Sequence, residues 1–78
     1  MSNILPLNLI PIGEKCRVKE LTSAGLIRRR LLDLGLIENT IIKPLHTSPS
    51  GDPVAYLIRG TVIALRSELA STILVEII

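Results

Sequence analysis

The stretch LIRRRLLDLGL at residues 26–36 is the one helical pattern in a chain that otherwise reads as short strands. Three of its apolar residues and one alanine that precedes it recur at i, i+3, i+7 and i+10, which is the spacing of one helix face. They are Ala24, Ile27, Leu31 and Leu34. Gly35 suits the end of such a helix, because glycine adopts a left-handed conformation at little cost. The pattern predicts a short α-helix over about residues 24–35, with the hydroxyls of Thr22 and Ser23 available to cap it.

Short runs of alternating or β-branched residues on either side of this helix predict strands. The runs cover residues 14–21, 40–47, 54–59, 61–65 and 72–77. Pro44 cannot donate a backbone hydrogen bond, so the second strand must be an edge or carry a bulge there. Residues 67–70 predict one helical turn capped by Ser67. The sequence therefore predicts a mainly β fold, a small five-stranded SH3-like barrel with one short inserted helix.

The length of the chain indicates one domain over residues 1–78. Residues 1–12 predict an N-terminal segment that leads across the bottom of the core, and residues 13–77 predict the barrel. Apolar residues make up 47% of the chain and Tyr56 is the sole aromatic residue, so we expect an aliphatic core.

The charge balance argues against a nucleic-acid partner. Nine Lys and Arg residues against seven Asp and Glu give a net charge of only +2. Nucleic-acid binders cluster positive charge, and single-strand binders also stack bases on aromatic rings. Lys15, Arg17 and Lys19 do alternate along the first strand, and we interpret them as a solvated strand face rather than a binding surface.

The residues that could carry chemistry are few. Cys16 alternates in phase with Val18, which indicates a buried, inert thiol, and His46 near a strand end indicates an exposed side chain. A nucleophile with a base and an orienting group cannot be assembled, so the sequence predicts no enzyme. It also predicts no cofactor and no dedicated metal site, because the carboxylates are single and have structural explanations. Those carboxylates are Asp33, Glu38, Asp52 and Glu68.

The N-terminal residues predict no targeting or membrane segment. No basic stretch precedes the apolar run of residues 4–12, and Pro6, Asn8 and Pro11 interrupt that run. It is too short and too broken for a signal peptide or a membrane span. With a single cysteine in addition, we expect a cytoplasmic protein.

Several short motifs resemble those of the FeoA family, small cytoplasmic proteins of bacterial ferrous-iron uptake. They occur in the family's order, from about residue 7 to residue 75. The matching residues are Gly13, the stretch RLLDLGL at 30–36, Gly51-Asp52-Pro53, Gly60, Ala64-Leu65-Arg66, Ala70, Ile73 and Val75. The chain departs from the family at Glu38-Asn39, where Pro-Gly is usual. Asn tolerates a left-handed conformation, so we expect that turn to survive.

The resemblance implies an SH3-like barrel and a non-catalytic accessory role beside FeoB, a membrane transporter with a cytoplasmic GTPase region. It leaves room for ferrous iron that is bound weakly or shared with a partner, and for a homo-oligomer. The alternative is a transition-metal-binding regulator related to the SH3-like domain of iron-dependent repressors. No helix-turn-helix precedes the barrel in this sequence, so we expect no element that would recognise DNA.

The predicted helix also supplies the candidate partner surface, an apolar margin bordered by arginines. Arginine is favoured at interfaces because its flat guanidinium stacks and forms paired hydrogen bonds. The candidate residues are Leu26, Arg28, Arg29, Arg30, Leu32 and Arg66. Two alternatives stay open: the arginines could form a solvated face paired with Asp33, or Arg30 and Arg66 could brace the helix against the barrel.

Overall fold

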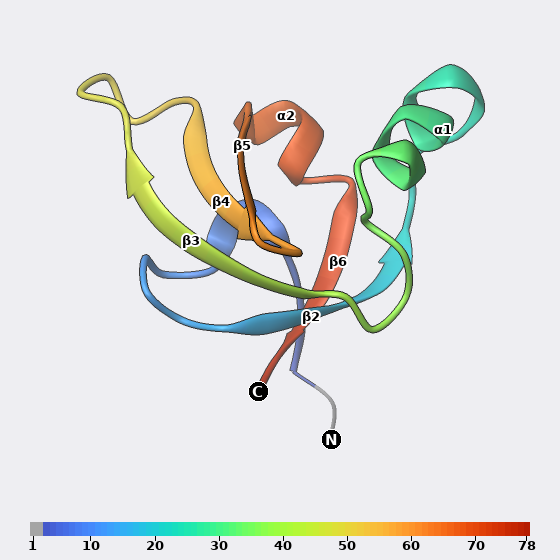
Figure 1. Ribbon diagram of the computed structural model, residues 1–78, viewed down its shortest axis with the longest axis horizontal. Helices are drawn as coiled ribbons and strands as arrows, with labels where there is room; N and C mark the ends of the chain where they lie inside the picture. The colour runs from blue at the N-terminus through green and yellow to red at the C-terminus, as the bar shows by residue number, and fades with distance from the viewer. Residues whose placement is uncertain (1–2) are drawn as a thin grey trace.

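The computed structural model describes residues 3–78 as a strongly curved antiparallel sheet with two short α-helices beside it (Figure 1). The elements follow the chain as β1 (Ile4–Pro6), the 3-10 helix η1 (Leu7–Leu9), β2 (Cys16–Leu21), α1 (Gly25–Asp33), β3 (Ile41–Thr47), β4 (Val54–Ile58), β5 (Thr61–Leu65), α2 (Ser67–Ala70) and β6 (Ile73–Ile77). The strand order is β1-β6-β2-β3-β4-β5. The mainly β fold with one short inserted helix and a helical turn at 67–70 is confirmed.

The number of strands is a correction, because the sheet has six strands where the sequence predicted five. The added strand is β1, which lies in the segment expected only to lead into the barrel. It pairs with β6 through Ile4↔Glu76, Leu5↔Val75 and Pro6↔Leu74. So short a strand has no local signature, since only the free edge of β6 provides its hydrogen bonds.

Pro44 lies at a bulge, as the sequence predicted. The register between β3 and β4 shifts between Pro44 and His46. On the other side of β3, the pairing with β2 involves only Ile41 and Ile42. No ladder bond therefore needs an N–H from Pro44, and its carbonyl accepts a hydrogen bond from the Gly13 N–H at 2.9 Å.

Helix α1 ends as predicted but does not begin as predicted. Gly35 has φ +98°, and its N–H donates to the Leu32 carbonyl while the Leu36 N–H donates to the Leu31 carbonyl, which is a Schellman motif. At the other end, Ala24 is the N-cap and makes no side-chain cap. The Thr22 hydroxyl instead donates to the Thr72 carbonyl at 3.1 Å. The predicted hydroxyl cap is therefore wrong, because the Thr22 hydroxyl bonds to the residue before β6 and not to the helix.

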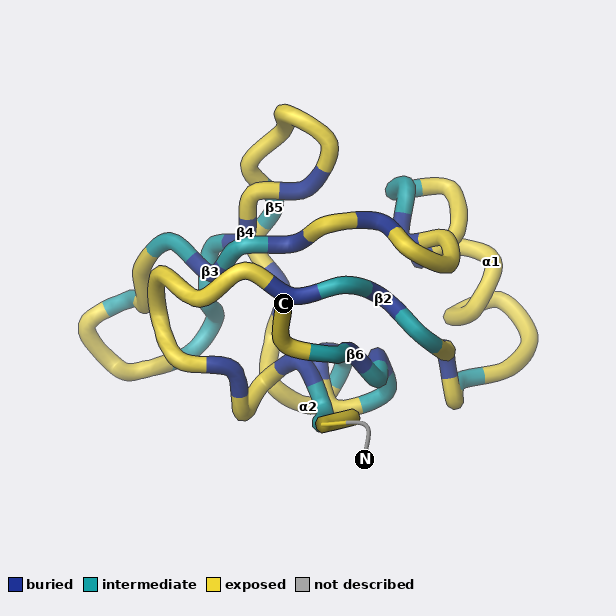
Figure 2. The backbone as a smooth tube through the Cα atoms, turned by 90° about the horizontal axis from the view of Figure 1, so that it is seen from below, coloured by how far each residue is buried: buried dark blue, intermediate teal, exposed yellow. Residues whose placement is uncertain are grey.

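The core is aliphatic apart from Tyr56 and Cys16, which are both buried. Helix α1 contributes little to it, and Figure 2 shows the helix almost entirely exposed. Of the predicted buried face, Leu31 is fully buried and Leu34 is half-buried, whereas Ala24 and Ile27 are exposed. The helix therefore packs on the sheet mainly through its C-terminal part, and the exposed Ile27 lines a neighbouring groove.

Within residues 3–78, no helix has the length and apolar character needed to cross a membrane.

Candidate partner-binding groove

An apolar groove of about 450 Å³ runs between α1, β5 and α2, which flank the same end of the curved sheet (Figure 1). Its apolar lining consists of Ile27, Leu31, Leu34, Ile63, Ala64, Leu65 and Leu69. Its polar lining consists of Arg30, Arg66 and Glu68. We call this surface the α1–α2 groove.

The α1–α2 groove exists because α1 leaves part of its apolar face uncovered. Leu31 and Leu65 are buried beneath it, whereas Ile27 remains 54% exposed. Leu34, Ile63 and Leu69 are only half-buried. Contiguous exposed apolar surface of this kind is typical of a site where another molecule binds.

The polar side of the α1–α2 groove is positioned by a turn far away in the sequence. Asp52 accepts a hydrogen bond from the Ser67 N–H at 2.8 Å, and its other carboxylate oxygen lies 3.5 Å from Nη1 of Arg66. The hydroxyls of Ser48 and Ser50 both donate to the Asp52 carbonyl, at 2.7 and 3.0 Å. The turn before β4 therefore contacts both the start of α2 and the guanidinium of Arg66. The predicted Ser67 side-chain cap is wrong, since Ser67 is the first residue of α2, the N-cap is Arg66, and no side-chain cap forms there.

The structure brings together only some of the predicted partner-binding residues. Arg30 and Arg66 both line the α1–α2 groove. Leu26, which is 86% exposed, lies with Arg29 on the outer side of α1, in a shallow depression that Arg30 also borders. Arg28 and Leu32 lie beside β2.

The alternatives for the arginines can now be compared with the contacts. Arg28 donates from Nη1 to the Leu21 carbonyl at 2.9 Å, which ties α1 to the end of β2. Among residues 3–78, the one carboxylate within ion-pair distance of an arginine is Asp52, paired with Arg66. Pairing of the helix arginines with Asp33 is therefore not observed, and the ion-pair partner of Arg66 is Asp52 of the β3–β4 turn.

Sequence reasoning missed the part of the groove that comes from β5 and α2. Ile63 belongs to a predicted strand and Leu69 to a predicted helical turn, and neither position by itself indicates that it lines a groove. Asp52 lies in the Gly51-Asp52-Pro53 motif, where the sequence predicts a turn. The family motif is the one sequence signal at Asp52. Its contact with Ser67 spans 15 residues and cannot be predicted from local spacing.

The residues that could have carried chemistry are placed as expected. Cys16 is buried, its thiol donates to the Ile42 carbonyl at 3.4 Å, and burial raises its pKa to about 11, so the thiol is protonated at neutral pH. His46 is exposed near the end of β3. In the part of the chain that the structure describes, no three His, Cys, Asp or Glu side chains gather where they could hold a metal ion.

Comparison with known proteins identifies the family. The family model of the FeoA domain matches residues 5–77. The chain belongs to the FeoA family. The predicted resemblance to this family is therefore confirmed.

One FeoA relative links the family to ferrous-iron transport. It is the Fe(2+) transport protein A/Fe(2+) transporter FeoB fusion protein of Porphyromonas gingivalis, 31% identical over 72 residues. The match covers 92% of this chain and 8% of the fusion protein, so the chain corresponds to a small part of that relative.

Solved FeoA structures confirm the fold. The FeoA-like protein of Clostridium acetobutylicum is 33% identical with a TM-score of 0.91, covering 100% of this chain and 91% of that chain. The FeoA of Stenotrophomonas maltophilia, complexed with zinc and described as a procaryotic SH3 domain protein, is 24% identical with a TM-score of 0.79, covering 96% of this chain and 88% of that chain. The SH3-like architecture that the sequence predicted is thus shared with both.

Proposed function

We propose that this FeoA protein is a non-catalytic accessory protein of bacterial ferrous-iron uptake. It acts in the cytoplasm by docking, through the α1–α2 groove, on the cytoplasmic GTPase region of a FeoB-type transporter. The observation that carries the proposal is an unfilled apolar groove bordered by Arg30 and Arg66 in a domain that a relative carries fused to FeoB. Fusion keeps two domains at a high local concentration, so the fused relative supports a functional contact between this domain and FeoB.

The α1–α2 groove suits a partner segment with an apolar side chain beside a carboxylate. Ile27, Leu34 and Ile63 would cover the apolar side chain, which stabilises binding by removing apolar surface from water. Arg30 and Arg66 would receive the carboxylate, because a guanidinium matches it with two parallel hydrogen bonds. Arginine is also among the residues that most often dominate the binding energy of an interface.

The test is a pair of matched double variants on α1. Ile27→Ser with Arg30→Glu removes one apolar and one cationic residue from the α1–α2 groove. Leu26→Ser with Arg29→Glu makes the same kind of change on the outer side of the helix, as the control. Titration calorimetry against the purified GTPase region should show a loss of about 1–3 kcal/mol for the groove variant. The control should change the binding free energy by less than about 0.5 kcal/mol.

Two outcomes would contradict the proposal. A larger loss for the control variant than for the groove variant would move the site to the outer side of α1. Absence of any heat or shift on mixing the wild-type protein with the GTPase region at about 0.1 mM, corresponding to a binding free energy weaker than roughly 5.5 kcal/mol, would remove docking altogether.

A further inference from the structure

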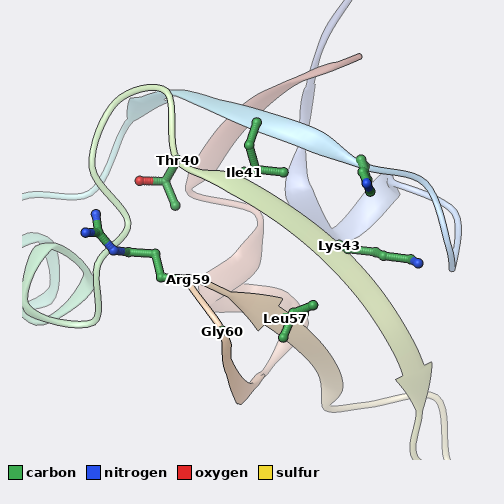
Figure 3. Close-up of a pocket in the computed structure, with 7 residues that line it drawn as sticks. Thr40, Ile41, Lys43, Leu57, Arg59 and Gly60 are labelled. Carbon is green, nitrogen blue, oxygen red and sulfur yellow. The ribbon is translucent and has the colours of Figure 1, made fainter.

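A second hollow lies on the outer face of the sheet and shares no residue with the α1–α2 groove. It has a volume of about 430 Å³ and is formed where β3, β4 and the start of β2 meet (Figure 3). Its lining consists of Lys15, Thr40, Ile41, Lys43, Leu57, Arg59 and Gly60. We call it the basic hollow.

The strand register places exposed aliphatic side chains in and beside the basic hollow. Ile42 and Tyr56 are buried, so their neighbours Ile41 and Leu57 point to the opposite face of the sheet. Leu57 pairs with Lys43 on one side and with Val62 on the other. Ile41, Leu57 and Val62 are 42%, 36% and 57% exposed. A sheet face turned toward water is normally polar, so this aliphatic row needs an explanation.

Three cations surround these aliphatic side chains and no acidic residue lines the hollow. Lys43 and Arg59 stand at its two ends with Ile41 and Leu57 between them (Figure 3), and Lys15 is the third. Within residues 3–78, none of the three lies within ion-pair distance of a carboxylate. On the same face of the sheet, the acidic residue Glu76 of β6 lies directly opposite Arg17 of β2 in the strand register.

The position of Arg59 depends on two neighbouring turns. It occupies the turn between β4 and β5 with φ +51°, a position where Asn or Gly would fit with less strain. Its side-chain stem lies over Gly35, since a Cβ at residue 35 would be 2.8 Å from Cδ of Arg59. Arg59 itself is exposed, so its guanidinium is open to a ligand at this end of the hollow.

We infer that the basic hollow is a second binding site, which takes an acidic segment of a partner protein that carries an aliphatic side chain among its carboxylates. The carboxylates pair with Lys15, Lys43 and Arg59, and the aliphatic side chain covers Ile41 and Leu57. A nucleic-acid backbone would complement the cations and leave the aliphatic side chains unmatched. A membrane surface fits protruding apolar residues, whereas these line a depression. The inference does not depend on the α1–α2 groove.

The probe is the end-capped peptide Glu-Glu-Leu-Glu-Leu-Glu-Glu, titrated into the ¹⁵N-labelled full chain. Amide shifts should concentrate on β3, on β4 and on the turn at Arg59 and Gly60. Replacing every Glu of the peptide by Gln should weaken binding about tenfold or more, and replacing both Leu by Ser should weaken it several-fold. Raising NaCl from about 0.05 M to about 0.3 M should weaken binding by the charged peptide several-fold through screening.

Matched charge reversals test the residues themselves. Lys43→Glu with Arg59→Glu should lower the affinity for the peptide about tenfold or more. Lys19→Glu with Arg29→Glu changes the net charge equally outside the basic hollow and should leave the affinity within about twofold. Thermal unfolding of each variant checks the fold, and Lys43→Gln, which should weaken binding about threefold, replaces the double variant if that one unfolds.

Four results would overturn the inference: no amide shift with the peptide at about 1 mM, equal affinity for the Gln peptide, equal losses for both charge reversals, or shifts that map elsewhere. Phosphatidylglycerol vesicles or a duplex oligonucleotide that shift these amides while the peptide does not would assign the hollow to a membrane or to nucleic acid instead. Shifts at these residues that depend on protein concentration alone would assign it to a second copy of the chain.

Discussion

Gly35 shows how one residue can serve two neighbours at once. Its φ of +98° lets α1 end in the Schellman motif, which directs Leu36 into the core. The missing side chain leaves room for the stem of Arg59, and its carbonyl accepts a hydrogen bond from the Thr40 hydroxyl at 3.0 Å. The turn after the helix and the seat of Arg59 therefore both depend on this glycine.

Replacing Gly35 by Ala should lower the free energy of unfolding by about 1–2 kcal/mol, because the left-handed backbone is costly for a residue with a Cβ. Most of the cost should remain in an Arg59→Ala background, since the flexible Arg59 stem can move aside and explains only a minor part. Urea unfolding of the four proteins in this double-mutant cycle measures both terms. An unchanged unfolding free energy for Gly35→Ala would show that the backbone at residue 35 is not strained by a side chain.

At the scale of elements, the short helix α2 depends on a residue outside it. A single helical turn has little stability of its own, and its first N–H groups need acceptors. Asp52 accepts from the Ser67 N–H at 2.8 Å, and the Ser48 and Ser50 hydroxyls hold the Asp52 main chain in place. The turn before β4 therefore acts as the N-cap of α2.

Replacing Asp52 by Ala should destabilise the protein by about 0.5–2 kcal/mol, as for other lost N-caps. The matched variant Asp52→Asn keeps an acceptor for the Ser67 N–H and loses only the exposed ion pair with Arg66, which contributes about 0–1 kcal/mol. Thermal unfolding followed by circular dichroism ranks the three proteins. Equal melting temperatures for the Ala variant and the wild type would mean that α2 forms without this cap.

At the scale of the whole molecule, the sheet brings apolar residues to its surface in two places and gathers no metal ligands among residues 3–78. Both surfaces combine a Leu or Ile lining with arginine or lysine at the border. They differ in origin, because the α1–α2 groove forms between helices and a strand, whereas the basic hollow forms on the strands themselves. We propose a protein partner for each of them.

Ferrous iron or zinc should therefore stabilise the isolated protein very little. With free metal at about 0.1 mM and a dissociation constant no tighter than that, the gain is below about 0.4 kcal/mol. Anaerobic thermal unfolding with and without the metal measures it, with Mg²⁺ as the control ion. A gain above about 1 kcal/mol that disappears in a His46→Ala variant would show a metal site that includes His46.

Some features of this protein follow from the sequence alone, because they depend on a residue and its immediate neighbours. Gly35 and Asn39 take positive φ values because glycine and asparagine tolerate them. Pro44 requires a bulge because it has no N–H. The alternation around Cys16 predicts its burial because successive strand residues point to opposite faces.

Other features are decided only by the tertiary structure, because they join residues that are distant in the chain. Strand β1 exists because β6 offers it an edge, and Asp52 caps α2 because the β3–β4 turn reaches Ser67. Leu57 lies beside Lys43 because β4 pairs with β3, and the turn after β4 adds Arg59 to the same hollow. Local sequence determines how each segment can fold, whereas the packing of segments determines which surfaces are left for a partner.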